Sequence, residues 1–303
     1  MDVSKNVIAA KNFLLRKNYA VFAVTNACGN KCAMCSIWKD ANKKFVSPQD
    51  FERLVVENNL GFVMLTGGDP LFHPQFKELL EVCERRGVLA TVCSNLINLT
   101  EENLKQFNGS VFQWLVSFDS KYPASFGRQR GNENIFGQTT RGLELLKANK
   151  QNFVVSLTVT KINKNELDDT IDYCDLHKLP INFCLTDSFT ETSFKLGNEE
   201  GVLLSDGEQA ELVEKILALK KQRKVWNSFV FLNDARRFFK KEKQKVPCLG
   251  GKKVFYFDWN GEKFACFKKK ENGGSPCSDC VVGCFREPSY LYQPVKFLLN
   301  NFS

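Results

Sequence analysis

The sequence predicts an α/β fold in which six parallel β/α units form a partial, open barrel, followed by a small cysteine-rich β-hairpin domain. From residue 19 to residue 223, apolar runs of strand length alternate with longer segments of helical periodicity, as in parallel β/α units. Near the C-terminus, two short strand-like runs are joined by an Asn-Gly turn and flanked by cysteines. Six units are too few for a closed eight-stranded barrel, so the sheet should curve into an open one.

The elements are expected in a regular order. A short packing helix at residues 7–17 comes first, and the helix after strand one begins with Ser47 as its cap and Pro48 in its first turn. After strand four, a polar loop should run from Asp119 to Gly131. The strands are expected at about residues 19–25, 62–66, 88–94, 112–118, 153–160 and 181–186. The helices after them should begin near residues 47, 74, 100, 137, 166 and 206.

This order divides the chain into three parts. We expect an N-terminal helix at residues 1–18, the partial barrel at residues 19–224 and an auxiliary domain at residues 225–303. The polar motifs of the barrel each follow directly after a predicted strand. Because parallel strands end at the same edge of a barrel, these motifs should lie together on one rim.

The composition favours a globular protein in a reducing compartment. Hydrophobic residues make up 43% of the 303 residues, which is enough for a sizeable core. Twelve cysteines would suggest disulfides in a secreted protein, but no signal peptide follows Met1. We therefore expect a cytoplasmic protein whose cysteines are metal ligands or core residues. No run approaches the roughly 18 apolar residues that span a membrane.

Three cysteines, Cys28, Cys32 and Cys35, follow the first predicted strand at spacings of four and three residues. Three soft ligands this close together on one loop predict a metal site. Tetrahedral zinc normally takes a closed set of four protein ligands, and no fourth Cys or His lies near this loop. The set suits an iron–sulfur cube whose fourth iron stays open to a substrate or cofactor.

This loop resembles that of the radical S-adenosylmethionine (SAM) superfamily, whose signature is three cysteines at this spacing after the first barrel strand. The resemblance implies a six-stranded partial barrel and a [4Fe-4S] cluster held by Cys28, Cys32 and Cys35. It also implies a reductase such as flavodoxin or ferredoxin as a partner. Reductive cleavage of SAM would then give methionine and a 5′-deoxyadenosyl radical, which takes a hydrogen atom from the substrate.

Polar segments after the next strands extend the resemblance. The run Gly67, Gly68, Asp69, Pro70 looks like the Gly-Gly-Glu-Pro segment of the family, which binds the amino group of the SAM methionine. Two glycines would let backbone carbonyls approach an ammonium group closely. His73 is expected to be a structural loop residue. The other SAM contacts implied by the resemblance are Ser94, Asn95, Ser117, Asp119 and Arg130, whose guanidinium fork suits the methionine carboxylate.

The C-terminal cysteines resemble those of the SPASM or twitch extensions of radical SAM enzymes, which hold auxiliary clusters. Cys248 and Cys266 flank the predicted hairpin, and Cys277, Cys280 and Cys284 follow on a Gly-rich loop. These thiols are fewer than a full SPASM domain brings, so one auxiliary [4Fe-4S] cluster is expected. Its ligands would be Cys248, Cys266, Cys277 and either Cys280 or Cys284, with a zinc ribbon of two thiol pairs as the alternative.

The remaining cysteines in the barrel lie within apolar helix or strand patterns. They are expected to be core residues, since free Cys behaves as a small hydrophobe. They are Cys83, Cys93, Cys174 and Cys184.

Much of the net charge of +8 is local. A solvated helix face, nucleic acid, anionic lipid and a phosphorylated substrate are the alternatives for these basic clusters, and we do not expect nucleic acid. The basic clusters comprise Lys220, Lys221, Arg223 and Lys224, and then Arg236, Arg237, Lys240, Lys241, Lys243 and Lys245.

The short segment before strand one leaves no room for the fused peptide-recognition domain that many peptide-modifying relatives carry. We therefore expect a small, non-peptide substrate. The cationic segment 236–241 and the apolar tail 290–299 suit an anionic substrate or peripheral contact with an anionic membrane, and the alternative is a tail that packs over the barrel. One alternative is a peptide maturase that acts with a separate recognition protein. Two further alternatives are a zinc-stabilised nucleic-acid-binding module and a cluster protein that only relays electrons.

Overall fold

A computed structural model describes residues 3–107, 109–186, 201–222, 225–266 and 280–293. Its strands form one curved sheet in the order β6-β5-β4-β3-β2-β1-β7-β8, parallel throughout except for the antiparallel pair β7 and β8. The predicted open partial barrel is therefore confirmed. The strands are β1 (Asn18–Thr25), β2 (Leu60–Gly67), β3 (Leu89–Ser94), β4 (Val111–Ser117), β5 (Phe153–Thr158), β6 (Ile181–Cys184), β7 (Val254–Phe257) and β8 (Lys263–Phe264).

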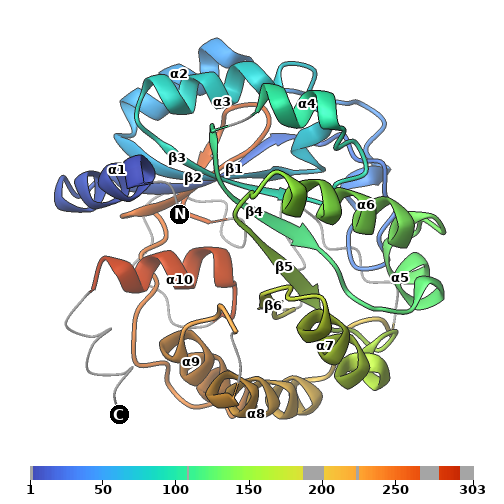
Figure 1. Cartoon of the computed structure of the whole chain (residues 1–303). Helices are drawn as coiled ribbons and strands as arrows, with labels where there is room; N and C mark the ends of the chain where they lie inside the picture. Colours follow the sequence, from blue (N-terminus) through green and yellow to red (C-terminus); the bar gives the residue numbers. More distant parts are fainter. Residues whose placement is uncertain (1–2, 108, 187–200, 223–224, 267–279, 294–303) are drawn as a thin grey trace.

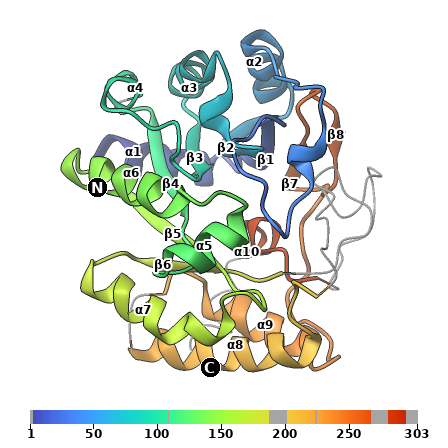
Figure 2. The ribbon, with the colours of Figure 1, turned by 90° about the vertical axis from the view of Figure 1, so that its right-hand side faces the viewer.

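Helices cover the outer face of this sheet (Figure 1). Figure 2 shows α2, α3 and α4 above β1 to β3, and α7, α8 and α9 at the opposite end of the curve. No helix of the described residues is both long enough and apolar enough to cross a membrane. The helices are α1 (Val3–Leu14), α2 (Pro48–Glu57), α3 (Phe76–Arg85), α4 (Glu101–Gln106), α5 (Pro123–Arg130), α6 (Ile135–Ala148), α7 (Leu167–Leu176), α8 (Asp206–Gln222), α9 (Phe229–Phe239) and α10 (Gly283–Leu291).

Strand alternation gives the sheet two different faces. Phe22 pairs with Leu65, Leu65 with Val92 and Val92 with Trp114 along one row of neighbouring strands. All four side chains are fully buried in the core between sheet and helices. Because successive residues of a strand point to opposite faces, their neighbours in sequence must point into the barrel lumen.

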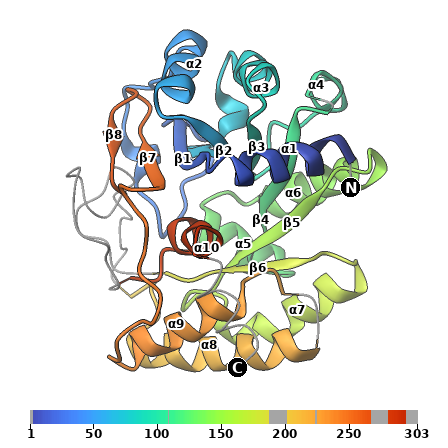
Figure 3. The same ribbon diagram turned by 90° about the vertical axis from the view of Figure 1, so that its left-hand side faces the viewer.

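The C-terminal hairpin continues the barrel sheet. β7 pairs in parallel with β1, with Val21 opposite Tyr256 and Phe22 opposite Phe257. The helix α10 then packs against α9, β7 and β1. Figure 3 shows α10 between the two ends of the curved sheet, on its inner side. The hairpin and α10 thus close much of the open side of the barrel.

The segment from Asp119 to Gly131, expected as a polar loop, contains the helix α5. Pro123 stands in its first turn, where the fixed φ of proline fits a helix. Gly131 ends it in the left-handed conformation, at a φ of 59°. Helical periodicity did not reveal α5 because its sequence, PASFGRQR, has few apolar residues.

A buried ion pair holds α10 in place. Arg286 of α10 is fully buried and donates to Asp234 Oδ2 of α9 and to Val246 O, both at 2.7 Å. Asp234 also accepts the backbone N–H groups of Lys245 and Val246. The pair therefore ties α9, α10 and the segment between them into one unit.

Removing the carboxylate of this pair should destabilise the whole protein. Asp234→Ala leaves the guanidinium of Arg286 buried without its counter-charge, which costs about 3 to 5 kcal/mol in the free energy of unfolding. Urea denaturation measures this loss. Glu57→Ala, which breaks the exposed pair with Arg53, is the control and should cost less than about 1 kcal/mol. Equal losses in the two variants would contradict this role of the pair.

Glu287 should make the stability of the α9–α10 unit depend on pH. Its carboxylate accepts the N–H of Ser228 at 2.8 Å, but burial dominates and raises its pKa from 4.5 to about 7. The native state then binds this proton more tightly than the unfolded chain, so stability falls as pH rises through this window. As the pH is raised from about 4.5 to about 7, the free energy of unfolding should fall less in Glu287→Gln than in the wild type, as measured by urea denaturation. Parallel pH profiles would show that Glu287 has no such effect.

Candidate functional site

The end of β2 holds the start of the cysteine loop. Gly68 N donates to Thr25 O at 2.7 Å. Asp69 N donates to Ala27 O at 2.8 Å. A Cβ at Gly67 would lie 2.0 Å from Thr25 O, and one at Gly68 would lie 2.1 Å from Ala27 O. The two glycines are therefore required because two backbone segments come into contact here. The sequence by itself predicts a different reason, that they allow carbonyl groups to approach an ammonium group.

The C-terminal end of α5 holds the other side of the cysteine loop. Lys31 N donates to Arg130 O at 3.1 Å, and Ala33 N donates to Gln129 O at 2.9 Å. A Cβ at Gly131 would lie 2.2 Å from Lys31 O. The loop that carries the three cysteines is thus clamped between β2 and α5. Gln129 was not among the predicted site residues, because its contribution is a backbone carbonyl that no sequence motif shows.

Asp69 joins the ends of β2 and β3. Its carboxylate accepts Ser94 Oγ at 3.0 Å, Asn95 N at 2.8 Å and Leu71 N at 2.9 Å. Burial raises the pKa of Asp69 to about 6, although these hydrogen bonds oppose the shift. Pro70 follows at the first turn of a short 3-10 helix. The structure therefore brings the predicted residues of the second and third strand ends together, with the Asp69 carboxylate bonded to protein donors.

Two polar residues near the hydrogen bonds of Asp69 have different roles. Asn95 Nδ2 lies 3.9 Å from Cys28 Sγ, so its amide borders the first cysteine. His73 is buried, and its Nε2 lies 2.9 Å from Val46 O. Asn95 is thus part of the cysteine site, and His73 is a structural residue.

Asp119 and Arg130 form a bidentate ion pair beside the second cysteine. Arg130 Nε and Nη2 donate to the two carboxylate oxygens of Asp119, at 2.5 Å and 2.8 Å. Asp119 also accepts Thr158 N at 2.9 Å. The positive charge of Arg130 opposes the rise that burial causes in the pKa of Cys32. The guanidinium fork predicted for the methionine carboxylate is therefore engaged by Asp119.

The three thiols of the loop have the donor chemistry of a cluster site. Burial raises the pKa of Cys28 to about 12 and that of Cys35 to about 11, so a positive centre is needed to make them thiolates. Among the described residues, no three Cys, His, Asp or Glu side chains converge as ligands of a single ion do. Thiolates of a cube bind separate irons and can stand farther apart. Asn30 Nδ2 in the same loop is buried without a partner in the described chain, a donor that a bound group would satisfy.

A sequence model described as the Radical SAM superfamily matches residues 22–174, about half of the chain. The chain belongs to the radical SAM superfamily. The family predicted from the cysteine motifs is thereby confirmed. Radical SAM proteins are enzymes that use a [4Fe-4S] cluster and SAM, so both are cofactors of this protein.

The relatives of this radical SAM chain are distant. The AdoMet-dependent heme synthase of Nitratidesulfovibrio vulgaris is 27% identical over 114 residues, which are 37% of this chain and 31% of that protein. The subtilosin biosynthesis protein AlbA of Bacillus subtilis is 26% identical over 158 residues, which are 50% of this chain and 35% of that protein. The matches therefore span less than half of the length of these relatives.

Solved radical SAM structures share the fold over most of the chain. Streptococcus suis SuiB bound to S-adenosylmethionine has a TM-score of 0.64 at 14% identity, and covers 96% of this chain and 71% of its own. A histidine-tagged anSMEcpe with bound AdoMet has the same TM-score and identity, and covers 83% of this chain and 72% of its own. These likenesses show the fold.

Four of the five tail cysteines gather in one small apolar cluster. Cys248 and Cys280 are buried within it, and Cys266 and Cys284 pack against it. Cys248 Sγ accepts Gly250 N at 3.4 Å. Cys277 lies outside the described residues. The structure thus brings together the two hairpin cysteines and both of the alternative ligands, Cys280 and Cys284.

Two of the four cysteines predicted as core residues do not lie in the core. Cys83 and Cys174 are fully buried between helices and sheet, as expected. Cys93 and Cys184 face the lumen instead, because each follows a core-facing residue on its strand. In β3 the apolar Leu89, on the same face as Cys93, hid this alternation, and β6 is only four residues long.

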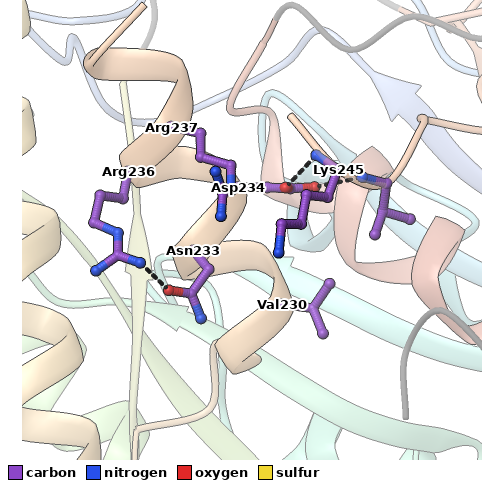
Figure 4. Close-up of a pocket in the computed structure, with 7 residues that line it drawn as sticks. Val230, Asn233, Asp234, Arg236, Arg237 and Lys245 are labelled. Carbon is purple, nitrogen blue, oxygen red and sulfur yellow. Dashed lines mark hydrogen bonds between the residues drawn. The ribbon is translucent and has the colours of Figure 1, made fainter. Parts of the chain in front are cut away.

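The basic cluster on α9 is largely paired. Lys240 bonds Glu214 at 3.0 Å, and Arg237 bonds Glu242 at 3.2 Å. Figure 4 shows a small pocket beside this helix, in which Arg236 turns aside to Asn233. The pocket has a volume of about 100 Å³ and is lined by Val230, Asn233, Asp234, Arg236, Arg237, Lys245 and Val246. Ion pairs of this kind favour a solvated helix face over a nucleic-acid surface.

A side chain at Gly68 should open the clamp on the cysteine loop. Gly68→Ala places a Cβ on Ala27 O, so the loop must shift, and we expect a loss of iron from the anaerobically reconstituted protein. Iron and sulfide analysis measures this loss. Gly137→Ala is the matched control, because a Cβ there meets nothing within 4 Å. Full iron content in Gly68→Ala would contradict the clamp.

Proposed function

We propose that Cys28, Cys32 and Cys35 bind the [4Fe-4S] cluster of a SAM-cleaving radical enzyme. The observation that carries this proposal is the double clamp on their loop, at the rim where the polar ends of β2, β3 and β4 meet. When bound and reduced by a flavodoxin or ferredoxin, the cluster and SAM together supply a 5′-deoxyadenosyl radical. The radical would form at the mouth of the barrel lumen.

The residues around the loop would bind and orient SAM. Backbone carbonyls near Gly67 and Gly68 suit its amino group, since Asp69 is already bonded to protein donors. Asn95, beside Cys28, and Ser117, at the end of β4, offer hydrogen bonds at the rim. The backbone carbonyl of Arg130 holds the loop beside Cys32. Its side chain is paired with Asp119, so its position would not change when the site closes against water.

We also propose that the tail thiols hold one auxiliary [4Fe-4S] cluster. Cys248, Cys266, Cys280 and Cys284 supply the four ligands, which the packing of these side chains in one group supports. This set uses both of the alternatives, Cys280 and Cys284, and Cys277 lies outside the described residues. A zinc ribbon remains the alternative, and zinc in place of iron in the Cys28, Cys32, Cys35 triple variant would establish it.

The substrate should be a small polar molecule bound in the lumen. None of the described strand residues on the lumen face carries a charge. The uncharged hydrogen-bonding groups at these positions suit a polar substrate. The lumen positions that offer partly exposed hydrogen-bonding groups are Thr66, Thr91, Gln113, Ser117, Ser156 and Asn182.

A peptide substrate is the second candidate. It is favoured by the solved structures of the same fold that carry peptides, SuiB with precursor peptide SuiA and anSMEcpe with the Kp18Cys peptide. One assay distinguishes the two candidate substrates. A small substrate should raise the yield of 5′-deoxyadenosine by itself, whereas a peptide would do so only with its recognition protein.

The reconstituted protein should cleave SAM to 5′-deoxyadenosine under a strong reductant. The variant with Cys28, Cys32 and Cys35 all replaced by Ala should lose this activity and about half of the iron, if the tail cluster is present. Chromatography of the products and iron analysis measure both effects. Cys83→Ala, in the core behind the sheet, should keep both. Continued cleavage by the triple variant would refute the site assignment.

A further inference from the structure

Three thiols from distant parts of the chain share the barrel lumen. Cys93 is on β3, Cys184 ends β6 and Cys284 lies in α10, and their thiols are close enough to interact electrostatically. Val92 and Phe183 lie in the core between the sheet and the helices. Because successive residues of a strand point to opposite faces, Cys93 and Cys184 point into the lumen. The lumen wall therefore carries sulfur where the proposed substrate and radical would meet.

Cys184 is connected to the cysteine loop through the side chain of Arg130. It pairs in register with Thr158 of β5, whose side chain opposes a rise in the pKa of its thiol. The Asp119–Arg130 pair acts on the same thiol electrostatically. The charge of Arg130 also acts on Cys32. The same guanidinium thus acts electrostatically on Cys184 and on a predicted ligand of the cluster.

Cys184 also has the accessibility and protonation that a hydrogen donor needs. It is exposed, whereas Cys93 and Cys284 are partly buried. Desolvation by neighbouring groups raises the pKa of Cys184, so the thiol keeps its proton at neutral pH. The side chain is therefore an accessible S–H group on the lumen face of β6.

An S–H bond is weaker than the C–H, O–H and N–H bonds of the other lumen side chains. A carbon radical in the lumen would therefore take hydrogen from sulfur in preference to its other neighbours. We propose that Cys184 is a catalytic residue that donates a hydrogen atom to a carbon radical formed in the lumen. This inference rests on the proposed function.

The step balances with the reductant that the activity already requires. The C–H bond of the product forms as the S–H bond of Cys184 breaks homolytically, which leaves a thiyl radical. One electron from the low-potential reductase, together with a proton from solvent, restores the thiol. The substrate then keeps its number of hydrogens, and one of them comes from solvent.

Cleavage of SAM in heavy water tests the proposal without knowledge of the substrate. In the absence of substrate, the 5′-deoxyadenosyl radical itself takes the atom from Cys184, which carries deuterium after exchange. We expect the 5′-deoxyadenosine from the wild type to gain one deuterium in mass spectrometry. Cys184→Ala and Cys184→Ser should lose this label, the latter because its O–D bond is too strong to be cleaved.

Two controls make the outcome specific. Cys174→Ala removes a thiol that is buried outside the lumen and should keep the label, and Cys93→Ala should also keep it. Label retained in Cys184→Ala, or lost in Cys93→Ala alone, would overturn the role of Cys184. Absence of any 5′-deoxyadenosine from the wild type would instead refute the proposed function, so the two failures are distinguishable.

Discussion

The candidate site depends on the backbone hydrogen bonds that clamp the cysteine loop between β2 and α5. Gly68 and Asp69 hold the start of the loop, and the carbonyls of Gln129 and Arg130 hold its middle. A loop with three partly buried thiols would otherwise have no reason to adopt one shape. The short distances from Gly68 and Gly131 to this loop show that the clamp excludes even a methyl group.

The rest of the barrel follows from the two faces of its strands. One face packs Phe22, Leu65, Val92 and Trp114 against the helices and supplies the hydrophobic stabilisation. The other face packs Val21 and Tyr256 of β1 and β7 against α10, and elsewhere it carries polar groups and thiols toward the lumen. The buried pair of Arg286 and Asp234 then fixes α10 over the open side, so the same helix that carries Cys284 also encloses the lumen.

The sequence predicted what depends on local pattern. The strands, the cysteine loop and the glycines after β2 all follow from spacing and periodicity. It did not predict α5, whose residues lack an apolar stripe, or the pairing of β7 with β1, which joins distant segments. The engagement of Arg130 by Asp119, and the lumen orientation of Cys93 and Cys184, depend on tertiary contacts and on strand register. Those features can be recognised only in the folded structure.

The central claim is that SAM binds next to a cluster held by Cys28, Cys32 and Cys35. Electron paramagnetic resonance of the anaerobically reconstituted and reduced protein tests it most directly. Adding SAM should change the spectrum of one [4Fe-4S] cluster, and Cys32→Ala should remove both that signal and its response. A cluster spectrum that SAM leaves unchanged would contradict this account.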